Sequence, residues 1–330
     1  MKQTKKQKNN RTKHKKYNRH KKHNHKGGTH INKESTHIKS SHNQTKKFVK
    51  LKCSPKPVGQ KRESTTCYEY DDLIKLKNMW NKKNPTNQIV TSDKDEIWKE
   101  LKNKLSNICD KESCWYKQIV TSYDDNHKFK ELFAPKSPDE WKINPNQWLS
   151  SSDIINVMKQ YEKIYKCFEF IGPSPVDYYF IEYPGECVWN ELCNFKLSEQ
   201  IKKGKTKIGI IFNTDTHDKG GSHWISLFIN IKKGFIFYFD SAGNPINKYV
   251  NKFVKTVTKQ GDELSPPIKF KFDQNYPREH QYGTTECGMY SLYFIIQMLE
   301  DKLTGEYLKT HVISDEYIEK FRQIYYNQDL

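Results

Sequence analysis

The segment from Tyr276 to Met298 reads YPREHQYGTTECGMYSLYFIIQM, and it determines how the rest of the chain can be interpreted. Its first half is polar and contains a proline and a glycine, which indicates a loop. Its second half spaces apolar residues at i, i+3, i+4 and i+7, the pattern of a buried helix. These residues are Met289, Leu292, Tyr293 and Ile296. Cys287 therefore lies where the loop becomes a helix.

The position of Cys287 favours a reactive sulfur. The first amide groups of a helix lack intrahelical partners and the helix dipole is positive there, so a thiolate is stabilised. Gln281 lies six residues upstream, where the loop can fold back and place its side-chain amide beside the sulfur as an oxyanion donor. The alternative is that Cys287 is a small buried residue at the start of a core helix, because most free cysteines are buried.

A predicted hairpin supplies a histidine and an acid. The runs 223–229 and 235–239 are largely apolar and a short turn containing Gly234 joins them, which is typical of two antiparallel strands. His223 begins the first run and Asp240 directly follows the second, so the pairing brings both to the same end of the sheet. A carboxylate there can orient the imidazole, while the imidazole takes the thiol proton. Together with Cys287 and Gln281 this is a complete set for acyl transfer.

Two other histidines compete for the role of base. His217 lies in the middle of the preceding loop, and His280 is too close to the predicted oxyanion donor to be placed freely. His223 is preferred because it adjoins the strand and shares its register. Taken singly, His223 could also be an ordinary surface or core histidine, and Asp240 an ordinary turn residue at a strand end.

The pattern from about residue 142 onward predicts a mixture of helices and strands. Trp148-Leu149 followed by Asp153 opens a helix that runs to about residue 165, and Pro173 and Pro175 are expected to end that region. The further predicted elements are a helix near 189–197, a strand at 208–212, a helix at 246–257 and a strand at 268–272.

Residues 67–141 have a globular composition with helical periodicity, which predicts a small helical module without chemistry of its own. Asp93 is expected to cap one of its helices. Cys109 and Cys114 lack the second tight pair that zinc sites usually show, so we expect them to be packing residues. The module is expected to extend a binding surface.

The tail, residues 1–66, holds 21 Lys and Arg against 2 Glu, a net charge of 21 − 2 = +19, whereas the remainder is 36 − 37 = −1. The tail has few apolar side chains to bury, which predicts disorder. The basic side chains could bind nucleic acid without sequence preference by releasing its counterions. The alternatives are a solvated charged arm or a targeting signal. The tail histidines show no ligand spacing, so no metal site is predicted.

Composition also bounds the class of protein. No apolar run approaches the roughly 20 residues of a membrane span, so no membrane contact is predicted. The N-terminus is charged rather than signal-like, and the eight cysteines are scattered. These features predict a soluble protein of a reducing compartment without structural disulfides.

Four short motifs occur in order between about residues 140 and 305. They are Trp148-Leu149 ahead of Asp153-Ile154-Ile155, Gly-Ser-His-Trp at 221–224, Phe-Asp-Ser at 239–241, and Gln281 followed by Cys287-Gly288. In this order and spacing they resemble the signature of the SUMO-protease and adenain-like cysteine peptidases.

The resemblance implies an α+β, papain-like or adenain-like fold over residues 142–330, with a central mixed sheet flanked by helices. It also implies the role of each site residue. Cys287 would be the nucleophile, His223 the general base, Asp240 the orienting acid and Gln281 the oxyanion donor. No cofactor and no metal are implied.

The resemblance further implies that Trp224, with Trp148, lines a narrow substrate channel that admits only glycine. Members of that family typically cut after Gly-Gly, so the resemblance implies a cysteine endopeptidase that cleaves Gly-Gly-X sites in polypeptides. The basic tail and helical module resemble segments that precede this domain in proteases of large DNA viruses. Such an enzyme would process core or capsid proteins during virion maturation, in the virion and host cytoplasm. One alternative is a cytoplasmic or nuclear deconjugase that acts on host SUMO or ubiquitin-like modifiers. The other is a non-catalytic packaging protein that binds nucleic acid.

Overall fold

The structure is a computed structural model that describes residues 52–60 and 66–327. The predictions made for residues 1–51, most of the basic tail, lie outside the described residues. The described chain contains a helical module and a mixed domain of helices and strands, and the module has an apolar core of its own.

A five-stranded mixed sheet forms the centre of the second part, with strand order β1-β4-β5-β6-β7. The strands are β1 (Phe168–Pro175), β4 (Lys207–Asn213), β5 (Trp224–Asn230), β6 (Phe235–Phe239) and β7 (Lys271–Gln274). The outer pairs β1–β4 and β6–β7 are parallel, and the inner pairs β4–β5 and β5–β6 are antiparallel. The predicted hairpin is β5–β6, in which Ser226 lies opposite Phe239.

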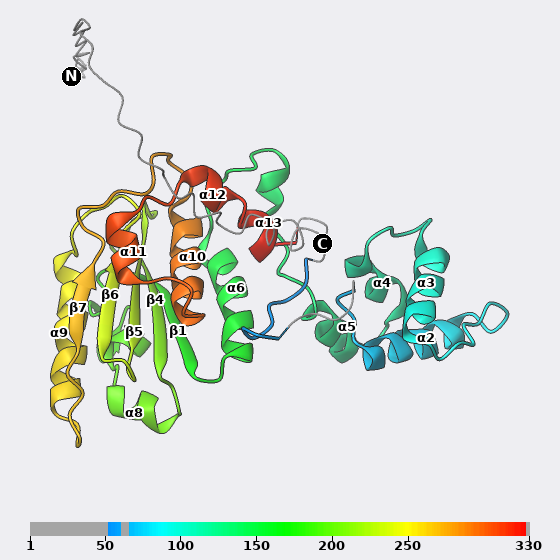
Figure 1. Cartoon of the computed structure of the whole chain (residues 1–330), viewed down its shortest axis with the longest axis horizontal. Coiled ribbons are helices and arrows are strands. Elements are labelled where there is room, and N and C mark those ends of the chain that lie inside the picture. Colours follow the sequence, from blue (N-terminus) through cyan, green and yellow to red (C-terminus); the bar gives the residue numbers. More distant parts are fainter. Residues whose placement is uncertain (1–51, 61–65, 328–330) are drawn as a thin grey trace, which may run out of the picture. The chain divides into compact units, whose positions relative to one another are not determined.

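Helices cover both faces of this sheet, which confirms the predicted α+β architecture (Figure 1). Along β5, Ile225, Leu227 and Ile229 face one core, whereas Trp224 and Phe228 face the other. The first core includes α9 and the second includes α6 and α10. The helices of this part are η1 (Asp139–Lys142), α6 (Ser151–Ile164), α7 (Asn190–Cys193), α8 (Leu197–Lys202), α9 (Lys248–Asp262), α10 (Cys287–Leu299), α11 (Gly305–Thr310), α12 (Asp315–Glu319) and α13 (Arg322–Tyr325).

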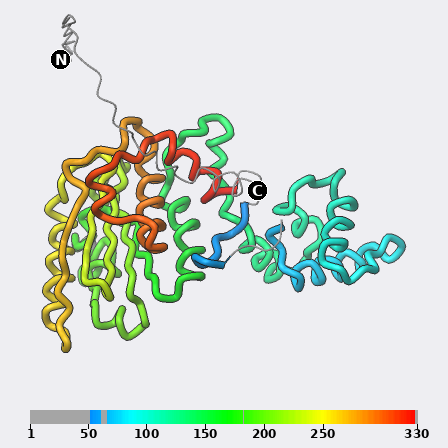
Figure 2. The backbone as a smooth tube through the Cα atoms, viewed as in Figure 1, coloured from blue at the N-terminus to red at the C-terminus, as the bar shows by residue number. Residues whose placement is uncertain are grey.

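The chain path connects the two faces through the edge strand β7. Figure 2 shows the chain leaving β6, running through α9 and returning as β7 before it enters α10. The strand predicted at 268–272 is thus present, but shifted to 271–274. The helix predicted near 189–197 is instead two short helices, α7 and α8.

The strand β1 was not predicted, because Pro173 and Pro175 were expected to end that region. Proline cannot donate to a strand ladder, but it is tolerated on an edge strand or at a bulge. β1 is one of the two edge strands of the sheet, and its register with β4 shifts between Ile171 and Ser174. The prolines therefore lie where no ladder hydrogen bond is lost, and a small pair of strands follows, β2 (Ile181–Tyr183) and β3 (Glu186–Cys187).

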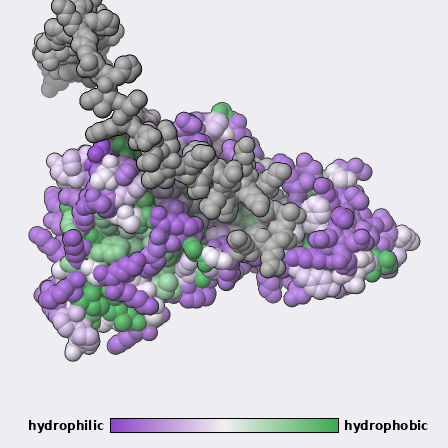
Figure 3. Space-filling view, in the orientation of Figure 1, coloured by the Kyte–Doolittle hydropathy of each residue, from purple (hydrophilic) through white to green (hydrophobic). Residues whose placement is uncertain are grey.

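The helical module consists of α2 (Tyr70–Lys83), α3 (Lys94–Leu105), α4 (Glu112–Ile119) and α5 (Tyr123–Lys130). Asp93 accepts hydrogen bonds from the amides of Asp95 and Glu96, which confirms the predicted helix cap. Residues 52–60 also belong here, because Cys53 pairs with Phe133 in a short bridge. Their predicted disorder is therefore corrected. Figure 3 shows a mostly hydrophilic surface over the module.

Three disulfides join six of the eight cysteines, so the expectation of no structural disulfides is wrong. The pairs are Cys53–Cys67, Cys109–Cys114 and Cys187–Cys193, with Cα atoms 5.4, 6.2 and 6.3 Å apart. The folded chain brings the Cα atoms of each pair within the usual range for a disulfide. The scattered positions of the cysteines in the sequence did not reveal this. Cys167 and Cys287 are free. No helix in the described part of the chain is both long and apolar enough to span a membrane.

The close packing of α10 on the sheet leads to a first prediction. An added Cβ at Gly209 in β4 would lie 2.7 Å from Cγ2 of Ile295 and 3.0 Å from the ring of Phe168. Gly209→Ala should therefore lower the free energy of unfolding by about 1–3 kcal/mol, the usual cost of overpacking a core. Urea denaturation of both proteins measures it.

Gly220→Ala is the matched control, because no heavy atom lies within 4 Å of a Cβ built at Gly220. Its unfolding midpoint should stay close to that of the unchanged chain. Equal midpoints for both variants would contradict the proposed tight contact between α10 and β4.

Candidate active site

The hairpin places a histidine and an aspartate together at one edge of the sheet. His223 immediately precedes β5 and Asp240 immediately follows β6. The β5–β6 register brings the two strand ends side by side, and His223 Nε2 lies 2.7 Å from Asp240 Oδ1. The predicted His–Asp pair is therefore present in the structure.

Asp240 is almost fully buried, and backbone and side-chain donors hold its carboxylate. Oδ1 accepts a hydrogen bond from the amide of Ala242 at 2.9 Å, and Oδ2 accepts one from Asn244 Nδ2 at 3.2 Å. Asn275 fixes the backbone of Asp240 from both sides: its Oδ1 accepts from the Asp240 amide and its Nδ2 donates to the Asp240 carbonyl. These contacts fix the orientation of the carboxylate toward His223.

Cys287 is the first residue of α10 and is only 2% exposed. Its backbone amide belongs to the first helical turn, where amides lack intrahelical acceptors. The next residue must be small, because a Cβ at Gly288 would lie 3.0 Å from Leu149 Cβ and 3.2 Å from Trp224 Cδ1. The helix terminus is thus packed tightly beside the sheet.

The imidazole of His223 interacts with both Asp240 and Cys287. Burial by itself would lower the pKa of His223, but hydrogen bonds and charge interactions with Asp240 and Cys287 outweigh it and raise the pKa to about 10. Because Nε2 is held by Asp240, the other ring nitrogen, Nδ1, is left for the thiol proton. The folded-state pKa lies above the ordinary value of 6.5, so protonation of His223 stabilises the fold fully below about pH 6.5, and this contribution is lost as the pH rises to about 10.

Gln281 lies in the loop before Cys287 with its amide orientation fixed. Its Oε1 accepts a hydrogen bond from Ser241 Oγ at 2.7 Å, and its Nε2 donates to the Gly283 carbonyl at 3.1 Å. A side-chain amide has two N–H donors, so one remains for an oxyanion. The backbone amide of Cys287 is a natural second donor.

The loop between Gln281 and Cys287 is held by a distant acid. Asp315 Oδ2 accepts hydrogen bonds from the amides of Tyr282 and Gly283 at 2.9 and 2.7 Å, and Oδ1 accepts one from Tyr290 Oη at 2.9 Å. Asp315 therefore ties the loop between Gln281 and Cys287 to α10.

Of the two predicted channel tryptophans, Trp224 contacts Leu149 and Trp148 directly precedes it in the sequence. Trp224 is 8% exposed and its Nε1 donates to the Leu149 carbonyl at 3.1 Å, whereas the neighbouring Trp148 is 41% exposed. Trp224 also lies against the position of Gly288, next to the nucleophile. Their predicted channel-lining role stays a prediction.

The rival histidines are occupied elsewhere. His217 Nδ1 lies 2.6 Å from Asp177 Oδ2, and the His217 ring stacks on Phe180. His280 is fully buried, its Nδ1 accepts from the Ile313 amide, and burial lowers its pKa to about 4. Neither histidine takes the place of His223.

Ser241, Asn275 and Asp315 were not predicted to support the site. Ser241 could have been found, because it follows Asp240 directly in the Phe-Asp-Ser motif. Asn275 and Asp315 carry no local signal, since their partners lie 35 and 33 residues away. Among residues 52–60 and 66–327, no group of three or more His, Cys, Asp or Glu side chains is placed to hold a metal ion.

Comparison with known protein families gives one match over just over half of the chain. The sequence profile described as Ulp1 protease family, C-terminal catalytic domain, matches residues 152–330 of the 330. A protein of Acanthamoeba polyphaga mimivirus named as a thiol protease is 27% identical over 290 residues, 82% of this chain and 92% of that protein. A SUMO-1 cysteine protease of African swine fever virus is 26% identical over 242 residues, 69% of this chain and 86% of that protein.

Solved structures show the same fold. A crystal structure of the African swine fever virus protease matches with a TM-score of 0.57 at 19% identity, covering 84% of this chain and 95% of that chain. A second structure of that protease, with selenomethionine, matches with a TM-score of 0.51 at 22% identity, covering 71% of this chain and 89% of that chain.

The His223 environment predicts selective alkylation of Cys287. An imidazolium beside the sulfur stabilises negative charge on it, so iodoacetamide at pH 6 should modify Cys287 faster than Cys167, the other free cysteine. Asp240→Asn should slow modification of Cys287, because it weakens the imidazolium. Peptide mass spectrometry over a time course measures both rates. Equal rates at the two cysteines, or no effect of Asp240→Asn, would show that His223 does not activate the sulfur.

Proposed function

Because the chain belongs to the Ulp1 protease family and is a cysteine-type peptidase, we propose that it cleaves polypeptides after Gly-Gly. The observation that carries the peptidase chemistry is the 2.7 Å contact between His223 and Asp240, with Cys287 near enough to interact with the same imidazole. A complete set of this kind argues against the alternative of a domain that only binds nucleic acid.

The geometry assigns a role to each group in hydrolysis. Cys287 Sγ attacks the carbonyl carbon of the scissile bond, and His223 carries the thiol proton to the leaving amine. The thioester that forms is then hydrolysed by water, with His223 acting as the base. The free N–H of Gln281 and the amide of Cys287 stabilise the oxyanion, while Asp240 holds the ring in place.

The preference for glycine is supported by how little of the nucleophile is accessible. Cys287 is 2% exposed and the adjoining Trp224 is 8% exposed, so only a slender chain can approach the sulfur. Glycine has no side chain to collide with the indole of Trp224 or with Leu149. The Leu149 backbone carbonyl accepts a hydrogen bond from that indole. Trp148, more exposed at the neighbouring position, would contact the residues upstream of the two glycines.

We propose viral structural polypeptides as the substrates and maturation as the process, in the virion and host cytoplasm. Relatives from two different viruses, which span most of this chain, support this assignment. The second candidate is removal of ubiquitin-like modifiers, since the African swine fever virus relative is named a SUMO-1 cysteine protease. Both candidates use the same site and differ in the protein that presents the glycines.

A fluorogenic peptide that ends in Gly-Gly before the reporter tests the proposed specificity. The unchanged chain should release the reporter, and Cys287→Ala should abolish release while leaving the fold intact. Replacing the last glycine of the peptide with alanine should reduce kcat/KM sharply, because its methyl group has no room beside Trp224. Equal cleavage of both peptides would refute the glycine preference, and activity in Cys287→Ala would refute the nucleophile.

Gln281→Ala should lower kcat by about 10²- to 10³-fold, the usual effect of removing one oxyanion donor. The matched control is Gln118→Ala, an exposed glutamine in the helical module, which should keep full activity. Steady-state kinetics on the Gly-Gly peptide compare the two. Unchanged kcat in Gln281→Ala would exclude the side-chain amide as an oxyanion donor.

We also propose that the basic tail binds nucleic acid without sequence preference. The support is compositional: 21 Lys and Arg against 2 Glu within residues 1–66. A chain shortened to begin at Lys52, which keeps Cys53 for its disulfide, should elute from a DNA column at lower salt and still cleave the Gly-Gly peptide. Elution of both chains at the same salt would exclude the tail as an anchor.

A further inference from the structure

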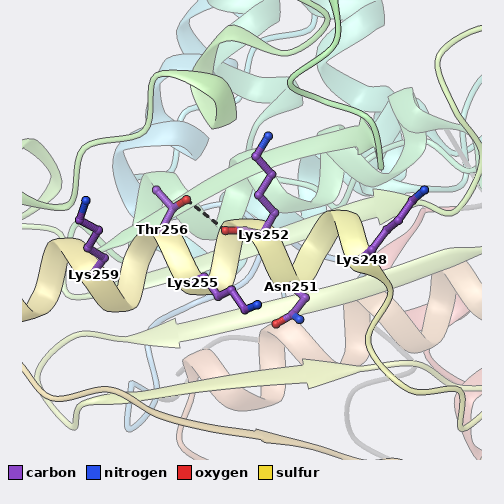
Figure 4. Close-up of a pocket in the computed structure, with 6 residues that line it drawn as sticks. All are labelled: Lys248, Asn251, Lys252, Lys255, Thr256 and Lys259. Carbon is purple, nitrogen blue, oxygen red and sulfur yellow. Dashed lines mark hydrogen bonds between the residues drawn. The ribbon is translucent and has the colours of Figure 1, made fainter.

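Helix α9 carries a row of basic side chains without acidic neighbours in sequence. Lys248, Lys252, Lys255 and Lys259 are all exposed, and residues 241–261 contain no Asp or Glu. Their spacing of four, three and four residues places them along one side of the helix. Figure 4 shows the side chains of Lys248, Lys252 and Lys259 extending from one side of α9 and that of Lys255 beside Asn251.

The charge of this row is not balanced by ion pairs. Among the described residues, Lys248, Lys252 and Lys255 form no ion pair with a carboxylate within 4.0 Å, and Lys259 lies 3.7 Å from Glu263. Like charges four residues apart on a helix repel each other and destabilise it. Residues 67–330 have a net charge of −1. A row of four lysines over three helical turns is therefore a local concentration of positive charge. A partner with negative charge would relieve the repulsion.

The surface beside the row has the features of a phosphate contact. The four lysines, with Asn251 and Thr256, line a shallow open hollow of about 440 Å³. The side-chain amide of Asn251 is a common type of donor to phosphate oxygens in protein–nucleic acid interfaces. The Thr256 hydroxyl instead donates to the Lys252 carbonyl at 3.0 Å.

Two tyrosine rings hold part of the row in position. Lys252 Nζ lies 3.4 Å from the centre of the Tyr179 ring, and Lys248 Nζ lies 4.9 Å from the centre of the Tyr249 ring. Such contacts restrict the long side chains before any partner binds, so less conformational entropy is lost on binding.

We propose that α9 binds the phosphodiester backbone of nucleic acid, on the sheet face opposite the active-site helix. From Lys248 to Lys259 the helix rises by about 16 Å, over which a duplex presents roughly ten phosphate charges. A membrane is a poorer partner, because the apolar side of α9, including Val250, Phe253 and Val257, is buried in the core and cannot enter a bilayer. An acidic peptide lacks the regular charge spacing of a phosphate backbone.

The consequence is a peptidase that can remain on nucleic acid while its active site stays open. α9 packs in the core on one face of the sheet and α10, which carries Cys287, packs on the other. A nucleic acid held by α9 therefore does not cover the nucleophile. This surface is separate from the basic tail, since it is formed by the folded domain itself.

The test uses the full-length chain with Lys252→Glu and Lys255→Glu combined. The control combines Lys99→Glu and Lys102→Glu, two exposed lysines at the same i, i+3 spacing on α3, so the change in net charge and the tail are identical. Fluorescence anisotropy measures binding of a labelled 20-base-pair duplex and a 20-base single strand over a range of salt. Circular dichroism melting and Gly-Gly peptide cleavage check that both variants are folded.

The α9 variant should bind at least about tenfold more weakly than the control, and the slope of log affinity against log salt should fall by about two, near one for each lost phosphate contact. A greater loss with the duplex or with the single strand identifies which form is bound. Equal affinities and slopes for both variants would overturn the proposal. The proposal would also be overturned if the α9 variant lost affinity only for polyglutamate or for anionic lipid vesicles, both measured in parallel, and not for nucleic acid.

A second measurement is independent of tail affinity. Acetylation of lysines in the unchanged chain, with and without saturating duplex, should show protection of Lys252 and Lys255 and little change at Lys99 and Lys102. Peptide mass spectrometry quantifies each site. Equal modification of Lys252 and Lys255 in both states would refute nucleic-acid contact at α9, whatever the peptidase activity of the protein.

Discussion

The hydrogen bond between His223 Nε2 and Asp240 Oδ1 is the interaction on which the rest of the site depends. It exists because the antiparallel register of β5 and β6 brings the start of one strand to the end of the other. Asp240 is 2% exposed, and a buried charge without partners costs several kcal/mol. Donors from Ala242 and Asn244 satisfy this carboxylate. Asn275 holds the backbone of Asp240, so the site also requires the loop after β7 to be in place.

Cys287, the proposed nucleophile, is positioned by packing rather than by charge. Gly288 allows α10 to approach Leu149 and Trp224 so closely that no larger residue fits without movement. Arg322, in α13, donates to the carbonyls of Gln147 and Thr285 and so connects the segment before Trp148 with the loop before Cys287. The last helices of the chain thus stabilise both segments beside the nucleophile.

The central sheet separates two kinds of surface. α10 is buried on nearly all sides, as expected of a helix between a sheet and other helices, and it delivers the thiol. α9 is amphipathic, with Val250 and Phe253 in the core and its lysines in water. A sheet buried on both faces can carry a catalytic helix on one face and a charged helix on the other with little interference between them.

Local patterns in the sequence determined α10, the β5–β6 hairpin and the positions of His223, Asp240 and Cys287 at the ends of these elements. These features follow from apolar periodicity and from a turn, which act over a few residues. Only the tertiary structure decided that β1 lies beside β4 and that Asn275, Asp315 and Arg322 support the site. The site segments that they hold are 25 or more residues away, and such contacts depend on which segments the folded core brings together. The disulfides likewise depended on the folded paths of loops, because cysteine spacing does not specify the distance between Cα atoms.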